Sequence, residues 1–581
     1  MKRVFALFAV VAIATYWNGL QAPFVWDDDT AITTNQSIHE ITESLIPPIE
    51  TPVAGRPLVN LSLALNYAMG GLETTGYHVF NLAVHVSCAL LLFGIVRRTL
   101  RRHRYLRSTA PVDAVALAAA LIWMVHPLLS ETIDYTTQRT ESMMGLFFLL
   151  TLYAAIRARG RRATLSGSPK WTAIAIASCA AGMATKESMA VAPVAVVLYD
   201  VIFEFDSPAE AWASRKGLYA GLAATWVELG AIMWRWPRST VGGTAVSPLM
   251  YALNQAQMIA RYLWLSVWPR SLVVDYGVPQ PLHIGDVVPQ GALILALIAA
   301  TLIALVRWPA IGFLGAMFFL TLAPTSSIVP IWSEVGAERR MYLPLAALVV
   351  LVVVLLARAA ERFKGPPEGG HDVRLKWRVA AAVAAIAVAA LASRTVDRNR
   401  DFSSPLALWQ SVVDRRPHGR ARFGLANQLM DASRHDEAIA QLRLAVVDYP
   451  DARAGLGTEL LVQGRLEEGI SVLEAFVQAD PSLPNRAPAR ALLAQAHRAI
   501  AERALSRQNA PLAADEARQS VALDASNADA HNILGAALAS QGNLTAAIPE
   551  FQAAVRINPR HPSAVNNLAR ALAMTNAGRR P

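Results

Sequence analysis

Cysteine is scarce in this chain, which has 2 cysteines in 581 residues. Both of them, Cys88 and Cys179, lie inside apolar stretches. Buried packing thiols fit this placement, which argues against disulfides and against a cysteine-based metal site. Charge is scarce as well, because Asp, Glu, Lys and Arg make up 17% of the residues while 54% are hydrophobic. This balance is the opposite of that of a soluble enzyme of similar length.

The apolar residues are unevenly distributed along the chain. Up to about residue 393 they form long runs separated by short basic segments, and beyond that point the chain is Ala-rich and polar with helical patterning. The sequence therefore predicts an all-α protein with two domains. We expect a polytopic membrane helical bundle over residues 1–393 and a soluble helical domain over residues 394–581.

Eleven apolar runs predict about eleven membrane spans. Basic residues gather at 2–3, 97–107, 157–162 and 358–378, segments that all emerge on one side if every run crosses the membrane. By the positive-inside rule this side is the cytoplasm. The net charge of +10 is then a topology signal, and no nucleic-acid partner is expected. The runs lie near 4–20, 79–96, 112–127, 142–156, 171–185, 189–203, 217–234, 291–306, 310–323, 343–357 and 378–392.

Two segments leave alternatives open. Residues 249–268 are long enough to span, but they contain Asn254, Gln255 and Arg261 with aromatic residues at both ends, which favours a helix lying at the membrane interface. Residues 1–20 are read as the first span, and the alternative is a cleaved signal peptide. The run continues into Tyr16 and Trp17, an interface-anchor pair, which favours the span.

A period of about 34 residues begins near residue 400 and is the signature of tetratricopeptide helix pairs. The clearest unit runs from Ala528 to His561, with Leu534-Gly535 on its first helix and Ala547 and Phe551 on its second. Weaker units precede it, and a last helix near 565–569 would cap the array. The sequence predicts an α-solenoid of about four repeats, a class that binds proteins. With eleven spans, the array lies outside the cytoplasm.

An acidic run, Asp27-Asp28-Asp29, follows the first apolar segment directly. Adjacent carboxylates repel one another and lose solvation beside a membrane, so such a run needs a functional reason. The other outer segments also carry ionisable residues, whereas the inner ones hold little besides Arg and small residues. We therefore expect the chemistry on the outer side, where nucleotide sugars are absent. A transferase working there needs a donor that has already been carried across, such as a sugar on a polyprenyl phosphate.

Transfer from such a donor has definable chemical needs. An acceptor hydroxyl loses a proton to a carboxylate, for which Asp27 and Asp28 are the candidates. The departing lipid phosphate needs fixed cations. We expect these from Arg56, Arg139, Lys186, Arg339 and Arg340, with Glu131, Glu187 and Glu338 holding the cations or contacting sugar hydroxyls. For Glu131 and Arg139, mutual pairing across a hairpin is the alternative. No His or Cys metal site is expected, and a divalent cation at the acidic run is the one cofactor left open.

Several motifs of the chain resemble those of the transmembrane and tetratricopeptide-repeat O-mannosyltransferases of the GT-C superfamily and their bacterial relatives. The first is Phe24-Val25-Trp26-Asp27-Asp28, in the first outer loop. The others follow in the family's order, and with the repeats the resemblance covers nearly the whole chain. They are Arg56-Pro57-Leu58, Gly76-Tyr77-His78, His126-Pro127 with Glu131 and Arg139, Lys186-Glu187, and Glu338-Arg339-Arg340-Met341-Tyr342-Leu343-Pro344.

The resemblance implies a GT-C-type bundle that carries out an inverting transfer of a sugar, typically mannose, from a polyprenyl phosphate to Ser or Thr of proteins. It points to Asp27 or Asp28 as the base and leaves Asp29 without a role. It favours Arg340 over Arg339, through the pattern Glu-x-Arg-x-Tyr-Leu-Pro. With these it marks His126 and Tyr342 as site residues.

The composition is that of a GC-rich bacterium, so we expect an inner-membrane enzyme with a periplasmic repeat domain that guides an acceptor protein. Two other functions remain open from the sequence. One is a non-catalytic membrane anchor that presents a repeat scaffold for envelope assembly. The other is a GT-C enzyme that glycosylates a lipid or a polysaccharide. The clustering of acidic and basic residues on the outer side favours an enzyme, because an anchor does not need it.

Overall fold

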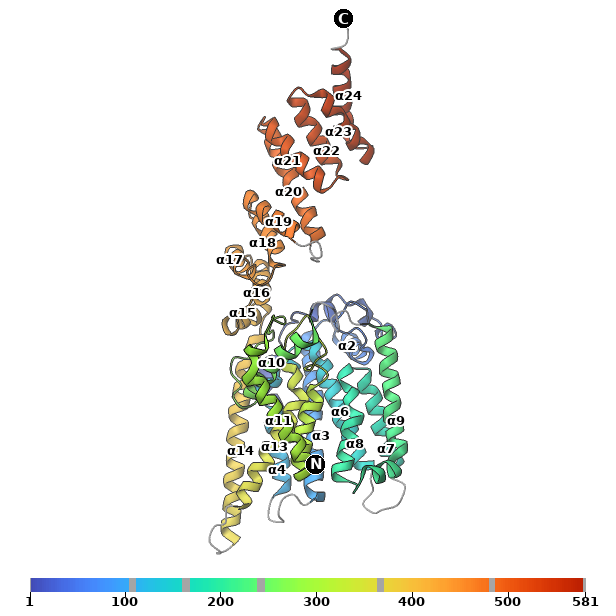
Figure 1. Cartoon of the computed structure of the whole chain (residues 1–581), viewed down its shortest axis with the longest axis vertical. Helices are drawn as coiled ribbons and strands as arrows, with labels where there is room; N and C mark the ends of the chain where they lie inside the picture. The colour runs from blue at the N-terminus through green and yellow to red at the C-terminus, as the bar shows by residue number, and fades with distance from the viewer. Residues whose placement is uncertain are drawn as a thin grey trace. The chain divides into compact units, whose positions relative to one another are not determined.

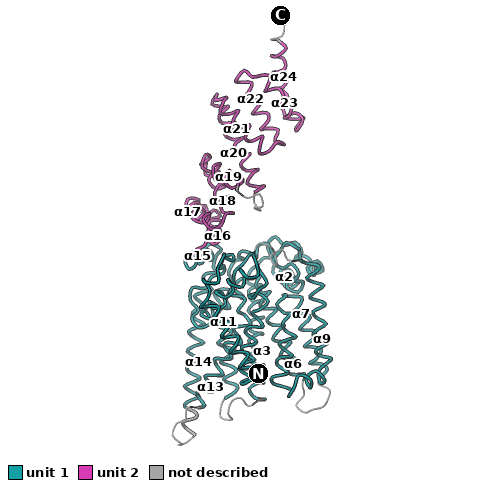
Figure 2. Tube along the Cα trace, viewed as in Figure 1, with its two compact units in different colours: residues 1–416 teal, residues 417–581 magenta. Residues whose placement is uncertain are grey.

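The computed structural model of the chain describes residues 2–103, 111–158, 168–237, 246–362, 370–479 and 486–577. These residues are predominantly helical and contain no β-strand, which confirms the all-α prediction. The chain forms two compact units, residues 1–416 and 417–581 (Figure 2). The domain boundary predicted at residue 393 falls inside helix α14 (Gly370–Asn399), and the division in the structure comes after one further helix, α15 (Pro405–Arg415).

Each of the eleven apolar runs lies on a helix of unit 1. Proline occupies the first turn of α7, α8, α9, α11 and α12. Residues in the first turn of a helix make no N–H hydrogen bond within the helix, so the missing N–H of proline costs nothing there. The helices are α1 (Lys2–Tyr16), α3 (Thr74–His103), α4 (Val112–Met124), α6 (Arg139–Ala158), α7 (Pro169–Met183), α8 (Ala192–Phe203), α9 (Pro208–Arg235), α11 (Val288–Arg307), α12 (Pro309–Leu322), α13 (Tyr342–Arg362) and α14.

Five helices among the described residues are long and apolar enough to cross a membrane. They become six if α4 and the following segment Pro127–Asp134, bent by 53°, count as one broken span. The count of eleven spans stays a prediction. Helix α10 (Pro248–Val267) is not among the five; it buries Asn254, Gln255 and Tyr262 and exposes Leu249 and Trp264. Its placement at the interface also stays a prediction.

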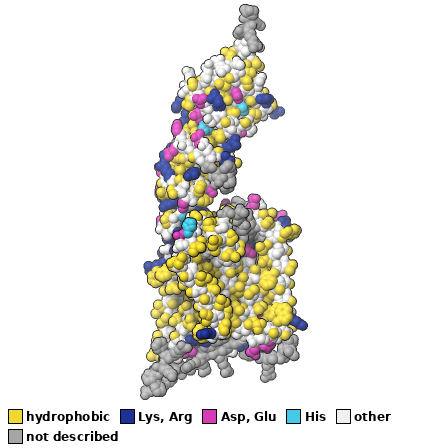
Figure 3. Space-filling view, in the orientation of Figure 1, with side chains coloured by type: hydrophobic (Ala, Val, Ile, Leu, Met, Phe, Trp, Pro, Cys, Tyr) yellow, Lys and Arg dark blue, Asp and Glu magenta, His cyan; other side chains and the backbone are white. Residues whose placement is uncertain are grey.

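The two ends of unit 1 differ in character. The N-terminus lies at the same end as the C-terminal ends of α3, α6 and α13 (Figure 1), so the basic segments gather there. Parts of these segments, residues 104–110, 159–167 and 363–369, lie outside the described residues. At the opposite end lie α2 (Pro57–Gly70), which has 14 residues, and α10, which has 20 (Figure 1). The five-residue helix α5 (Ser130–Asp134) lies between α4 and α6 in the chain, and several single-turn helices join the longer elements. The face between the two ends is rich in hydrophobic side chains (Figure 3).

Unit 2 is a row of helical hairpins. Small residues let paired helices approach: a Cβ on Gly535 would lie 2.7 Å from the Phe551 ring, and Ala547 and Ala554 are fully buried. Gly542, at φ +80°, makes the turn between α22 and α23, a conformation that glycine adopts without steric penalty. The helices are α16 (Gly419–Asp431), α17 (His435–Ala445), α18 (Ala452–Val462), α19 (Leu466–Ala479), α20 (Arg486–Ser506), α21 (Ala510–Leu523), α22 (Ala528–Ser540), α23 (Leu544–Ile557) and α24 (Pro562–Ala577).

Candidate functional site

The acidic run turns its first two carboxylates in different directions. Trp26, which precedes them, has φ +49°, a left-handed conformation that costs a bulky residue about 1–2 kcal/mol. Asp28 is fully buried. Its Oδ2 accepts the N–H of Val25 at 3.0 Å, and its Oδ1 accepts both the N–H and the hydroxyl of Thr137, at 2.7 and 2.5 Å. Asp28 therefore fastens the acidic loop to the start of α6.

Asp27, in contrast, is only partly buried. Its N–H donates to the Tyr135 hydroxyl at 2.9 Å, so Tyr135 fixes the backbone at this residue. Burial raises the pKa of the Asp27 carboxyl above its ordinary value. The charges of Arg339 and Arg56 and the Tyr135 hydroxyl oppose this rise, but the pKa remains raised. Burial also raises the pKa of Asp28, to about 7, against the hydrogen bonds from Thr137 and Val25. Asp29 is exposed.

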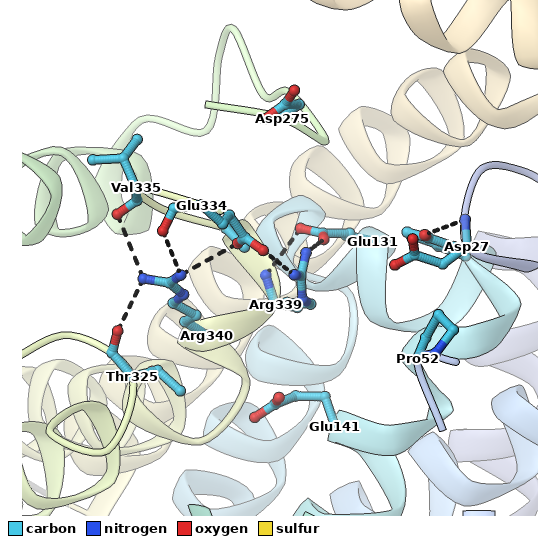
Figure 4. Close-up of polar contacts among 12 residues, drawn as sticks. Asp27, Pro52, Glu131, Glu141, Asp275, Thr325, Glu334, Val335, Arg339 and Arg340 are labelled. Atoms are coloured by element: carbon cyan, nitrogen blue, oxygen red, sulfur yellow. Dashed lines mark hydrogen bonds and ion pairs between the residues drawn. The ribbon is translucent and has the colours of Figure 1, made fainter. Parts of the chain in front are cut away.

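Arg339 belongs to the single-turn helix η9 (Glu338–Met341) and joins this helix to Glu131. Its Nη1 donates to Oε1 of the fully buried Glu131 at 2.5 Å, and its N–H donates to Oε2 of Glu131 at 3.0 Å. Its Nη2 bonds Glu334. Arg339 keeps a partly exposed side chain, and Figure 4 shows it on the side of Glu131 and Asp27. It is the cation whose charge acts most strongly on Asp27.

The neighbouring Arg340 points elsewhere. Its Nη1 donates to the carbonyl of Thr325 at 2.9 Å, and its Nη2 donates to the carbonyl of Glu334 at 3.2 Å. The Tyr251 hydroxyl lies 3.3 Å from Nη1. In Figure 4 the guanidinium turns toward Thr325 and Val335, away from Asp27. Nη2 also lies 3.4 Å from the Glu334 carboxylate, so Arg340 ties the loop before η9 together.

Two further predicted cations belong to the same end of the unit. Lys186 is buried and pairs with the buried Glu141. Burial lowers the pKa of Lys186, while the charge of Glu141 opposes this. Arg56 donates to the Pro52 carbonyl at 2.8 Å and lies 3.9 Å from the Glu187 carboxylate. The charge of Arg56 acts on both Asp27 and Lys186, so these segments form one electrostatic cluster.

The remaining predicted residues are buried in the framework. Arg139 donates to Asn66 Oδ1 at 2.7 Å and lies 4.6 Å from the Phe80 ring centroid, so the alternative pairing of Glu131 with Arg139 is wrong. His126 caps the turn at Leu128 through Nδ1. The Tyr342 hydroxyl contacts His85 Nδ1 at 2.8 Å. Glu338 accepts the N–H of Val273 at 2.6 Å and lies 3.6 Å from Arg398.

Among the described residues, no group of three or more His, Cys, Asp or Glu side chains is placed to hold a metal ion. The acidic run does not offer paired ligands, because the oxygens of Asp28 already accept hydrogen bonds from N–H and O–H groups. The site does offer a carboxylate, that of the partly buried Asp27, in the field of Arg339 and Arg56. Such a pairing of a base with fixed cations serves proton abstraction beside a developing anion.

Sequence reasoning missed Tyr135 and Glu334, and it ranked Arg339 below Arg340. Tyr135 lies 108 residues from Asp27, and no local pattern connects the two. Glu334 precedes the Glu-Arg-Arg motif by four positions and could have been found as a nearby acidic partner for two adjacent arginines.

Comparisons with known proteins agree with this architecture. The tetratricopeptide-repeat family model matches residues 390–453, 498–562 and 541–577, which confirms the predicted repeat domain. Protein O-mannosyl-transferase TMTC4 of Mus musculus is 25% identical over 510 residues, which cover 76% of this chain and 66% of that protein. Protein O-mannosyl-transferase Tmtc3 of Drosophila melanogaster is 24% identical over 576 residues, which cover 83% of this chain and 59% of that protein.

These relatives are homologues of the chain, so the resemblance predicted from its motifs is confirmed. The chain spans 66% and 59% of the length of these two relatives. Among solved structures, ArnT from Cupriavidus metallidurans in the apo state aligns with a TM-score of 0.39 and 15% identity, over 82% of this chain and 81% of that one.

Proposed function

We propose that the chain is an integral-membrane glycosyltransferase that moves a sugar from a polyprenyl phosphate to Ser or Thr hydroxyls of proteins. The observation that carries this proposal is the placement of Asp27. Asp27 is partly buried, and its carboxylate lies in the field of Arg339 and Arg56. Its N–H bonds Tyr135, which lies just before the N-terminal end of α6 and so opposite the basic segment that follows α6. The names of the homologues support the transfer reaction, and they support mannose as the sugar.

The arrangement of the charged groups supports two separate roles, that of the base for Asp27 and that of anion stabilisation for the cations. Asp27 takes the proton of the acceptor hydroxyl, whose oxygen then forms a bond to the anomeric carbon of the sugar. The bond from that carbon to the phosphate oxygen breaks with inversion, and the polyprenyl phosphate leaves as an anion. The positive charge of Arg339 stabilises this anion, and the charges of Arg56 and Lys186 add to the effect. We assign to Arg339 the place that the sequence pattern gave to Arg340, because Arg339 lies on the side of Asp27 and its charge acts on that carboxylate, whereas Arg340 turns toward Thr325 and Val335.

A lipid-linked donor fits the membrane setting of the site. The cluster belongs to a unit that has helices long and apolar enough to cross a membrane, so an isoprenoid chain can stay in the bilayer while its phosphate reaches the cations. Tetratricopeptide arrays bind proteins, which supports a role for unit 2 in guiding the acceptor. We place the protein in a bacterial inner membrane with the repeats in the periplasm.

The proposal is tested by mass spectrometry of envelope proteins from cells with the intact gene, with no gene, and with an Asp27→Asn copy. We expect hexose on Ser or Thr in the first cells only. Unchanged protein glycosylation in all three, with a change in a glycolipid or polysaccharide instead, would reject the protein acceptor. No change in any glycan would reject the transferase. A reporter that is active only in the periplasm, fused after Pro581, should be active.

A further inference from the structure

Trp26 is held by two aromatic residues from distant parts of unit 1. Its ring stacks on Tyr135, with centroids 6.5 Å apart and planes inclined by 12°. It also packs against Trp409 of α15, with centroids 5.0 Å apart. Trp409 is 7% exposed, whereas Trp26 is 38% exposed. Trp409 therefore covers one side of the residue that directly precedes Asp27.

The backbone at Trp26 needs such support. A non-glycine residue with positive φ is strained, and the strain persists only where the surroundings hold the conformation in place. The left-handed turn at Trp26 decides which carboxylate of the run enters the core and which stays accessible. Tyr135 provides part of the support, since it stacks on Trp26 and accepts the N–H of Asp27.

A chain of ion pairs connects helix α15 to Glu338 of η9. Arg415 at its C-terminal end donates to the Leu272 carbonyl at 2.9 Å and pairs with Asp401 at 2.5 Å. Asp401 also pairs with Arg398 of α14 at 2.7 Å, and Arg398 lies 3.6 Å from Glu338 of η9. Although α15 packs within unit 1, it falls inside the stretch 390–453 that matches the repeat family. The helix that leads into the repeats thus contacts the acidic loop.

We propose that Trp409 is a positioning residue for Asp27, which holds the Asp27 carboxylate in its working orientation by packing against Trp26. This inference rests on the proposed function, because it takes Asp27 as the base. It assigns to α15 a role in catalysis that is separate from any role of the repeats in binding acceptors. A displacement of about 1 Å in a reacting group is enough to lower a rate by about 10²-fold.

The test compares three variants of the full-length protein in a transfer assay with mannosyl-phosphoryl-polyprenol and a Ser/Thr peptide. Trp409→Ala removes the ring, Trp409→Phe keeps an aromatic contact, and Leu408→Ala removes a neighbouring buried side chain of α15. We expect Trp409→Ala to lower kcat by about tenfold or more, with less than about a threefold change in donor KM. Trp409→Phe should restore most of the rate. Leu408→Ala should affect thermal stability but not kcat per folded molecule.

The pH dependence of kcat distinguishes positioning from a merely structural effect. Water that enters beside Trp26 reduces the desolvation of Asp27, while Arg339, Arg56, Glu334 and Tyr135 still surround it. The acid limb of the Trp409→Ala profile should therefore move to lower pH. A limb at the wild-type position, a Trp409→Phe variant as slow as Trp409→Ala, or a loss confined to donor KM would each overturn the inference. Asp27→Asn is assayed in parallel: full activity there rejects the proposed function, whereas loss there with normal Trp409→Ala activity rejects only this inference.

Discussion

The ion pairs of the two units cited below differ in the burial of their partners and in the number of residues that separate the partners along the sequence. In unit 2, pairs such as Arg518 with Asp515 and Arg465 with Glu468 join residues three positions apart, and both partners are exposed. In unit 1, Arg339 pairs with the fully buried Glu131 across 208 residues, and buried Lys186 pairs with Glu141 across 45. Exposed local pairs add little to stability, and breaking a buried pair is strongly destabilising.

We interpret this difference as a mark of the proposed site. In unit 2 the arginine pairs are mostly exposed, and the buried ionisable residues Glu459 and His497 pair with histidine or glutamate partners. The end of unit 1 that holds Asp27 buries several carboxylates and cations, such as Glu131 and Lys186, whereas Asp27 is only partly buried. Such an arrangement is costly in desolvation and is typical of sites that stabilise charge during a reaction.

The largest expected effect separates Asp27 from Asp28. Asp27→Asn cannot accept a proton, so transfer should fall by at least about 10²-fold while thermal stability stays near wild type. In Asp28→Asn, the side-chain NH₂ group faces N–H or O–H donors that now bond the carboxylate, so these donors lose their acceptor. The unfolding free energy should therefore fall by about 1–3 kcal/mol. Transfer rates per folded molecule and thermal unfolding in detergent measure both. Equal loss of rate in the two variants, without loss of stability in Asp28→Asn, would contradict this division.

A smaller effect should distinguish the two adjacent arginines. Arg339→Lys keeps the charge beside Glu131 but loses the planar fork, so donor KM should rise by about 10-fold or more. Arg340→Lys loses hydrogen bonds to carbonyls, and it should lower Tm while donor KM changes little. Donor titrations of both variants test this. A larger rise in KM for Arg340→Lys would return the phosphate site to the residue that the sequence pattern favours.

The smallest effect is expected in unit 2. Arg518→Ala removes an exposed pair between residues three positions apart on one helix, and Tm and transfer rate should both stay at wild-type values. Thermal unfolding and the peptide assay provide the measurements. A large loss of transfer without loss of stability would mean that this surface takes part in acceptor binding, and that the contrast between the two units is less sharp.

Much of the fold is predictable from the sequence, because it depends on local patterns. The apolar runs predicted the eleven helices on which they lie, but not α2, α5 or α15, and the period of about 34 residues predicted the hairpins of unit 2. The sequence also singled out Asp27 and Lys186, because ionisable residues stand out beside apolar runs; the charge of Arg56 acts on both.

The orientation of adjacent residues was not predictable. The choice between Asp27 and Asp28 depends on the left-handed turn at Trp26, and the choice between Arg339 and Arg340 depends on which face of one helical turn meets Glu131. Trp409 lies 383 positions from Trp26, so only the folded chain brings the two together. These features are tertiary, and no spacing in the sequence encodes them.

The pH dependence of kcat tests the central claim, that Asp27 is the base, most directly. A base works when deprotonated, so a raised pKa means that the rate falls as the pH decreases through a value above the ordinary aspartate pKa of about 3.9. The account predicts this acid limb in the wild type and in Asp28→Asn. It also predicts that the residual activity of Asp27→Asn lacks the limb. An unchanged limb in Asp27→Asn, or its loss only in Asp28→Asn, would contradict the account.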